Sequence, residues 1–272
     1  MLNRPATDTQ ITHLQRLWLY VLGLLVVAFL VLPVLIVVPM SFNDSRFMSF
    51  PPKAFSLRWY QNFVTSPEWL EAIWVSIRAA VLTMLIATPF GVATAYGLSK
   101  SGSRWSGIIM MAVISPLIVP VILVAIGLFY LYARLGMVNS MVGIVLAHVV
   151  LATPFVIITV SSALSHVDAG LERAARNLGA GPLRAFVNVT LPQIRTGVMS
   201  GALFAFVTSL DEVVISSFIS GGENTTLTKK MFSGLRDQVD PTIAAVSSIL
   251  IVLSIVILLG VTLYDRRRGA GT

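Results

Sequence analysis

The chain of 272 residues contains no cysteine, only three histidines and few charged side chains. The absence of cysteine excludes a disulfide framework, a thiolate metal site and a cysteine nucleophile. His13, His148 and His166 lie far apart in the sequence, and none has a partner at metal-ligand spacing. Charged residues make up 11% of the chain, against roughly a quarter in a soluble domain, so the composition favours a lipid bilayer as the main solvent.

Motifs for nucleotide hydrolysis and for nucleophilic catalysis are missing as well. No Gly-Lys pair occurs, so the chain has no phosphate-binding loop of the G-x-x-x-x-G-K-[ST] kind. Serine, histidine and acidic residues are present, but their spacing does not match a nucleophile elbow or a catalytic triad. We therefore expect no enzymatic activity in this chain, no metal site and no cofactor of its own.

Long apolar runs dominate what is present, and hydrophobic residues make up 56% of the chain. A bilayer core of about 30 Å needs roughly 20 apolar residues in a helix. Six stretches meet this length and predict membrane spans at about 17–40, 72–98, 106–132, 141–164, 197–220 and 241–263. We expect an all-α polytopic membrane protein whose first span is a retained anchor, because its apolar run is too long for a signal peptide and no small-residue cleavage site follows.

The basic residues predict the orientation of these spans. With a cytoplasmic N-terminus, 11 Lys and Arg residues fall on the cytoplasmic side and 7 on the outside, with Arg78 left near the outer end of the second span. This distribution places the tails 1–16 and 264–272 in the cytoplasm, and it explains the formal charge of +7 without nucleic acid. Prolines inside the spans, including Pro116 and Pro120, predict kinks.

A polar elbow, residues 165–196, interrupts the apolar chain between the fourth and fifth spans. Apolar residues from Leu171 to Leu178 recur at helical spacing, with charged residues on the opposite face. The Gly179–Gly181 stretch is expected to end this helix, Pro182 to begin a second one, and Pro192 to stop it. From these residues alone, an amphipathic segment lying on lipid headgroups is as good a reading as a protein-binding surface.

The elbow resembles the EAA motif of permease subunits in ABC importers, whose form is E-A-A, three residues, Gly, nine residues, Ile, one residue, Leu-Pro. The matching residues in this chain are Arg173-Ala174-Ala175, Gly179, Val189 and Leu191-Pro192. Arg173 stands at the usual acidic position, and Glu172 lies one residue earlier. The resemblance implies that Glu172, Arg173, Ala174, Ala175, Gly179, Leu191 and Pro192 form the coupling segment that docks on an ATPase subunit.

The resemblance extends over nearly all of residues 55–263 and implies the six-helix fold of type I importer permeases. The stretch Thr208–Gly221 is similar to the polyamine branch, which includes spermidine/putrescine permeases. Implied partners are two ATPase subunits carrying ATP and Mg²⁺, a second permease subunit, an extracytoplasmic solute-binding protein and the lipid of the bacterial inner membrane.

Two acids lie inside the fifth expected span. Ionisable residues in a membrane are costly, and they usually face a cavity or a pathway. Thr208, Glu212 and Ser216 recur every four residues, which predicts one polar helix face with Asp211 at its edge. These four residues are our candidates for a cation pathway; the alternative is that the acids pair with Arg78 or cap backbone groups freed by a kink.

Aromatic residues before the second span are further candidates. Trp59 and Tyr60 could contact an amine through cation–π interactions at the mouth of the pathway. The alternative is an aromatic belt at the membrane interface.

The substrate class stays open. The resemblance favours a small cationic amine of the polyamine type, yet Ser115–Leu123 carries no acid where polyamine relatives often have one. A smaller amino acid-like or aminophosphonate solute, such as 4-aminobutyrate, is therefore the first alternative. An ion-coupled secondary transporter using Asp211 and Glu212 is the alternative from another class.

Overall fold

The computed structural model describes residues 13–14, 16–45, 50–238 and 240–269, and the side chains as far as Val256. The chain forms two compact units: residues 1–66 with 234–272, and residues 67–233. The described part of the chain is helical, and its only β pairing consists of isolated bridges. The expected tail 1–16 falls almost wholly outside the described residues, and the end of the expected tail 264–272 also falls outside them.

The first unit is built from two long helices and a short one. Its elements are α1 (Leu17–Ser41), α2 (Arg58–Thr65), the π-helical η2 (Gly234–Gln238) and α13 (Thr242–Gly269). Side chains of α1 are exposed along most of its length, which suits a helix surrounded by lipid or by other subunits. The helix α13 continues for six residues beyond the expected end of the last span at residue 263.

Short hydrogen bonds attach α2 to both long helices of this unit. The Trp59 indole donates to the Asn43 carbonyl at 2.7 Å, and the Tyr60 hydroxyl lies 2.6 Å from Ser41 Oγ. Asn62 donates to Thr242 Oγ1 at 2.9 Å. Trp59 is buried, which favours a packing role over the expected contact with an amine. We assign Trp59 and Tyr60 to the packing of this unit.

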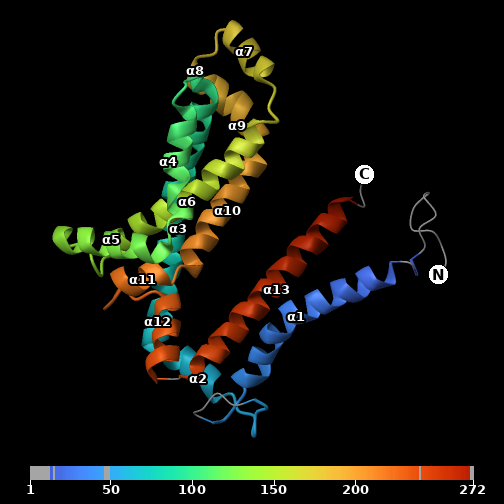
Figure 1. Ribbon diagram of the computed structural model, residues 1–272, viewed down its shortest axis with the longest axis vertical. Helices are drawn as coiled ribbons and strands as arrows, with labels where there is room; N and C mark the ends of the chain where they lie inside the picture. The colour runs from blue at the N-terminus through green and yellow to red at the C-terminus, as the bar shows by residue number, and fades with distance from the viewer. Residues whose placement is uncertain (1–12, 15, 46–49, 239, 270–272) are drawn as a thin grey trace. The chain divides into compact units, whose positions relative to one another are not determined.

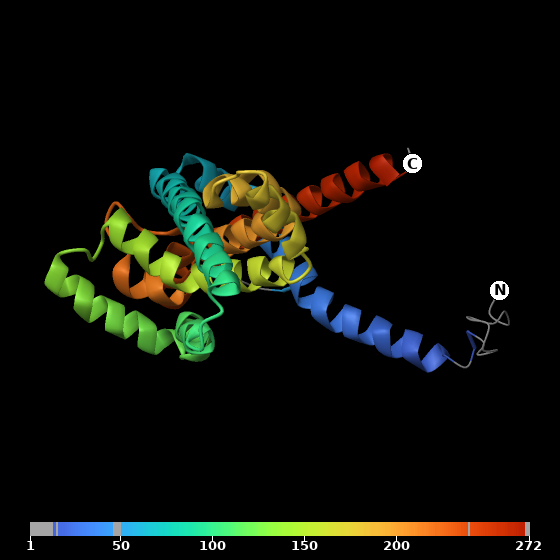
Figure 2. The same ribbon diagram turned by 90° about the horizontal axis from the view of Figure 1, so that it is seen from above.

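The second unit, residues 67–233, holds the elbow and the acid pair. Its elements are α3 (Pro67–Ser101), α4 (Ser106–Ile118), α5 (Val121–Leu135), α6 (Met141–Leu164), α7 (Ala169–Asn177), α8 (Pro182–Ala185), the π-helical η1 (Phe186–Thr190), α9 (Leu191–Gln193), α10 (Arg195–Asp211), α11 (Val214–Ile219) and α12 (Leu227–Ser233). Figure 1 labels the elbow helices α7, α8 and α9. Helices α3, α6 and α10 pack side by side and form the centre of the unit (Figures 1 and 2). In the part of the chain that is described, α1, α3 and α6 are each long and apolar enough to cross a membrane.

The third expected span is not one straight helix. Helices α4 and α5 meet at a bend of 97°, so that α4 follows the long axis of Figure 1 while α5 lies across it. Pro120 provides the N-cap of α5 with extended backbone, and Pro116 lies inside α4. The expected kink is therefore confirmed, but it is large enough to divide the span into two helices.

Capping residues set the turn between α5 and α6. Gly136 ends α5 with a φ of +67°, a left-handed conformation that glycine adopts without steric cost. Ser140 then caps α6 by accepting a hydrogen bond from the Gly143 amide at 3.0 Å. This turn lets α6 run back along α3.

Glycines allow α3 and α10 to approach α6 closely. A Cβ added to Gly91 of α3 would lie 2.6 Å from the Val156 side chain. A Cβ added to Gly201 of α10 would lie 2.6 Å from Thr159 Oγ1 and 3.1 Å from the Val156 Cα. Small residues at these crossings replace side-chain contact with backbone contact, which is how helices associate closely in membranes.

We expect Gly91→Ala to lower the thermal unfolding midpoint of the detergent-purified subunit, because overpacking at Val156 costs about 1–3 kcal/mol. Gly97→Ala in the same helix is the matched control, since nothing lies within 4 Å of a Cβ there. That variant should leave the midpoint unchanged or raise it. Equal midpoints for both variants would contradict the close crossing.

Candidate functional site

The elbow has the two-helix form expected from its sequence. Helix α7 ends at Asn177, and Gly179 follows with a φ of +90°, which a residue with a Cβ adopts only with strain. Pro182 is the first residue of α8, where its missing amide is not needed. Asp168 caps α7 by accepting from the Gly170 amide at 2.7 Å.

The expected stop at Pro192 comes one residue later, after Gln193. The path from α8 stays helical through η1, and Pro192 occupies the second position of α9. The change of direction comes at Ile194, which is buried and precedes α10 directly.

Glu172 is the internal anchor of the elbow. Only 3% of this residue is exposed, and its carboxylate accepts from four side chains. Tyr96 and Lys100, at the end of α3, bind it at 2.7 and 2.8 Å. Thr190 of η1 donates at 3.0 Å, and Arg176 one turn along α7 lies at 3.1 Å. The carboxylate thus connects α7, η1 and the end of α3.

These contacts control the ionisation of Glu172. Burial raises the pKa of its carboxyl, but hydrogen bonds from Lys100, Tyr96 and Thr190 outweigh burial and lower the pKa to about 2. The carboxylate is therefore charged at every physiological pH. The contact that Glu172 makes between the elbow and α3 therefore does not change with pH in the physiological range.

The expected coupling residues divide between two faces. Glu172 is buried and Leu191 is half-buried, so both face the rest of the unit. Arg173, Ala174, Gly179 and Pro192 are exposed. Exposed with them are large apolar side chains, namely Leu171 at 50%, Leu178 at 89% and Leu183 at 76%. The outer face of the elbow is thus apolar, with basic residues beside it, which is typical of a protein-binding surface.

The fifth expected span is broken at the acid pair. Helix α10 ends at Asp211, Glu212 has extended backbone with a ψ of 114°, and α11 begins at Val214. The continuous polar face expected from Thr208 through Glu212 to Ser216 is therefore wrong, because the helical period does not continue across the break. Thr208 lies on α10 and is half-buried, whereas Ser216 lies on α11 and is buried.

Glu212 satisfies the backbone at this break. Its carboxylate accepts from the amides of Val214 and Ile215 at 3.1 Å and from Ser216 at 3.0 Å. In an apolar surrounding, each of these amides would otherwise lack a partner. The backbone-capping alternative thus holds for Glu212, whereas Asp211 is exposed at the end of α10. The Arg78 guanidinium lies over the Trp74 ring, 5.9 Å from its centroid.

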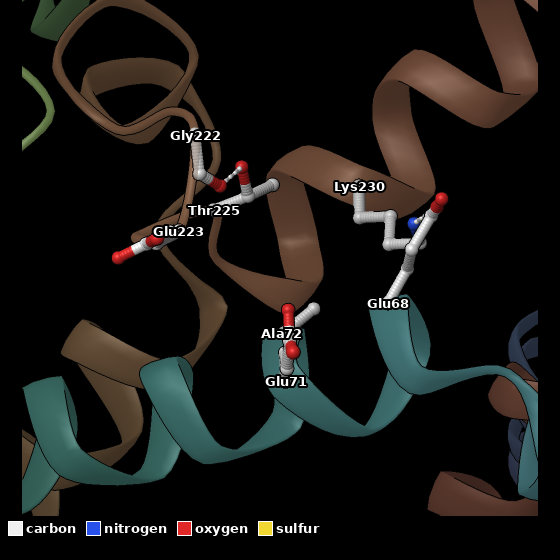
Figure 3. A pocket seen from close by; sticks show the side chains of 7 residues that line it. All are labelled: Glu68, Glu71, Ala72, Gly222, Glu223, Thr225 and Lys230. Atoms are coloured by element: carbon white, nitrogen blue, oxygen red, sulfur yellow. Dashed lines mark hydrogen bonds and ion pairs between the residues drawn. The ribbon is translucent and has the colours of Figure 1, made fainter.

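A pocket of about 150 Å³ lies at the other end of α3 from the elbow. Glu68, Glu71, Glu223 and Lys230 line it together with Ala72, Gly222 and Thr225. Figure 3 shows the Glu68 and Lys230 side chains pointing toward each other, and their charged atoms are 2.5 Å apart. Two further carboxylates, Glu71 and Glu223, leave this pocket with an excess of negative charge.

Comparison with known proteins decides the family. Residues 87–269 match the family described as binding-protein-dependent transport system inner membrane component. The chain belongs to this family. It is a multi-pass permease subunit of the inner membrane, and the EAA resemblance of its elbow is consistent with that assignment.

Individual relatives extend the match beyond the family region. The permease is 34% identical over 241 residues to the putrescine transport system permease protein PotI of Escherichia coli K12, covering 86% of this chain and 85% of the relative. It is 32% identical over 248 residues to the spermidine/putrescine transport system permease protein PotC of the same strain, covering 90% and 92%.

A solved structure supports the fold. A chain in the crystal structure of a bacterial ABC transporter, involved in the import of the acidic polysaccharide alginate, aligns with a TM-score of 0.69. The alignment covers 94% of the permease and 98% of that chain at 17% identity. The permease therefore has the ABC importer permease fold.

We expect Glu172→Gln to loosen the elbow by roughly 1–3 kcal/mol, because a neutral amide replaces a buried carboxylate with four donors. Hydrogen exchange followed by mass spectrometry should show reduced protection factors in residues 169–194. Arg184→Gln, at an exposed position in the same elbow, should leave the protection factors unchanged.

The same anchor predicts a pH dependence. Because the folded elbow lowers the pKa of Glu172 to about 2, the ionised carboxylate stabilises the elbow at pH values above the ordinary carboxyl pKa. That stabilisation is lost as the pH falls toward 2. Protection factors in the wild type should stay constant above about pH 5 and decline below about pH 4. A decline that begins near pH 6 would point to another group.

Proposed function

We propose that this permease subunit forms part of an ATP-driven importer for a small cationic amine of the polyamine type. The observation that carries the proposal is the identity with permeases for putrescine and for spermidine/putrescine over at least 85% of every chain compared. A match of this extent covers most of the chain rather than a single motif.

The surroundings of the acid pair agree with a cationic solute. Asp211 is exposed where α10 stops, and its charge adds to that of the buried Glu212 carboxylate. Two neighbouring negative charges in a weakly polar unit attract cations and raise their local concentration. Our proposed pathway residues are Asp211 and Thr208, with Glu212 and Ser216 shaping the break behind them.

The elbow is the proposed contact with the ATPase. Its exposed leucines and alanines offer an apolar surface outside the spans, and Glu172 fixes this surface to the end of α3. Movement of an ATPase subunit against the elbow would therefore be passed directly to the central helices. We propose two ATPase subunits that bind ATP and Mg²⁺, because no phosphate-binding loop occurs in this sequence.

The remaining partners follow from the same assembly. We propose a second permease subunit and a solute-binding protein outside the membrane. We also propose that both termini are cytoplasmic, because Lys and Arg residues are in excess on that side of the predicted spans. The elbow then lies in the cytoplasm, and the pocket of Figure 3 faces the binding protein. ATP binding and hydrolysis would switch the bundle between two states, each open to one side.

A zwitterionic solute such as 4-aminobutyrate is the second candidate. The observation favouring it is the absence of an acid in Ser115–Leu123, because a polycation is best held by several carboxylates. The two candidate solutes can be distinguished by measuring their effects on the same assembled complex.

The deciding experiment measures ATPase activity of the assembled complex in lipid nanodiscs with solute-loaded binding proteins. Polyamines, 4-aminobutyrate, an aminophosphonate and an uncharged control are compared. We expect selective stimulation by polyamine, lost in Arg173→Glu and Gly179→Asp complexes. Transport that needs no ATPase and follows a proton or sodium gradient would instead establish a secondary transporter.

Asp211→Asn should lower the uptake of a cationic amine by about tenfold, as expected when a steering charge is removed from a pathway. Uptake into proteoliposomes at subsaturating solute is the measurement, with assembly of the complex checked by gel filtration. Asp44→Asn, at another exposed aspartate, is the matched control and should transport as the wild type does. Equal uptake in both variants would remove Asp211 from the pathway.

A further inference from the structure

His148 of α6 is a buried polar residue that the sequence analysis gave no role. Only 1% of it is exposed, and it lies on the same helix as Ile144 and Leu151, which belong to a buried apolar cluster. Both ring nitrogens nevertheless have partners. Nδ1 lies 2.7 Å from Ser209 Oγ, and Nε2 lies 3.2 Å from Ser216 Oγ.

The two serines stand on opposite sides of the break in the fifth span. Ser209 belongs to α10, which ends at Asp211, and Ser216 belongs to α11, which begins at Val214. A single imidazole ring on a third helix therefore bridges the break. Its two nitrogens point in different directions, so one ring binds both helices at once.

The hydroxyl protons form a directional chain. Ser209 donates its one proton to Thr83 Oγ1 of α3 at 3.3 Å, so its oxygen accepts from Nδ1–H of the histidine. A neutral ring with this tautomer has Nε2 as an acceptor, and Ser216 donates to it. The chain thus runs from α11 through α6 and α10 to α3.

The same chain reaches the acid pair. The Ser216 amide donates to the Glu212 carboxylate, and Thr228 of α12 donates to the Glu212 carbonyl at 2.8 Å. The position of the Glu212 side chain is therefore linked to the histidine through one residue. Apolar packing could hold the three helices together, but it would not fix the angle at which two helix ends meet.

We propose that His148 is a positioning residue for solute transport, a latch that sets the geometry of the Asp211–Glu212 break by holding α10 and α11 together. The latch rests on the proposed transport function. The angle between α10 and α11 can change at the acid pair when the bundle switches between its two proposed states. Hydrogen bonds to hydroxyls can break and form with new partners during this change, whereas packed side chains cannot. Without the latch, ATP hydrolysis continues, but the geometry of the break no longer changes together with it.

Substitution of the ring can separate its two bonds. The amide of His148→Asn replaces Nδ1 and reaches Ser209 only, whereas the longer amide of His148→Gln replaces Nε2 and reaches Ser216 only. Ser216→Ala removes the second bond from the other side. Ser217→Ala on the same helix is the matched control, because its hydroxyl binds the Val213 carbonyl instead.

The test is uptake per ATP hydrolysed in proteoliposomes holding the assembled complex. We expect His148→Asn and Ser216→Ala each to lower this ratio by about tenfold, the factor for one lost hydrogen bond. The double variant should show the same tenfold loss rather than a hundredfold loss, because both changes remove one bond. His148→Gln should also lower the ratio, and Ser217→Ala should not.

A thiol reporter gives a second measurement. The chain has no cysteine, so Val213→Cys at the break introduces a single thiol. Its labelling rate should differ between nucleotide-free and ATP-bound complexes, and His148→Asn should abolish that difference.

The outcomes are distinguishable from a failure of the proposed function. If the wild-type complex transports nothing with any loaded binding protein, the proposed function fails, and the latch fails with it. If the wild type transports but the variants keep its uptake ratio, only the latch proposal is overturned. It is also overturned if ATPase activity, uptake and thermal stability fall together, because that pattern indicates a purely structural histidine.

Discussion

The close contact of α3, α6 and α10 at Val156 is the constraint on which the second unit depends. Gly91 and Gly201 approach Val156 from two sides, leaving no room for a Cβ at either position. Lipid offers no hydrophobic drive for helix association, so close contact and hydrogen bonding supply the stabilisation. Once these three helices are fixed, the elbow, the break and the pocket are each placed at the end of one of them.

Two buried carboxylates have different structural roles in the second unit. Glu172 is held by side chains with two positive charges and two hydroxyls, and it connects the elbow to α3. Glu212 is held by backbone amides, and it makes the break in the fifth span tolerable. In both cases the cost of burying a charge is offset by several donors, which a single opposite charge would not achieve.

Helix α3 relates the two ends of the unit. At about 1.5 Å per residue, its 35 residues extend over roughly 50 Å, from the pocket near Glu68 to the Glu172 anchor. The Ser76 hydroxyl accepts from the Leu227 amide in the first third of α3, and Lys100 binds the elbow at the end of α3. One continuous helix therefore connects the elbow to the pocket and, through Thr83, to Ser209 at the break.

Local patterns along the chain are sufficient to predict the helical class, the approximate apolar segments and the form of the elbow. These follow from short-range rules: apolar period, the left-handed backbone that suits Gly179, and the place of Pro182 at a helix start. The resemblance to importer permeases rested on the same local residues. Such features are decided within a few residues of chain, so they can be predicted without knowing what packs against them.

The roles of the polar residues depend instead on contacts that form when the helices pack. Glu172 has partners 76 and 72 residues away in sequence, Tyr96 and Lys100 respectively, and these make an apparent docking residue into a buried anchor. The break after Asp211 depends on a carboxylate turning back onto the next helix, and a helical period cannot reveal this. His148 acquires two serine partners from beyond 60 residues. Hydrogen bonds between distant segments form only after the helices have packed, because the packing alone brings those donors and acceptors within reach.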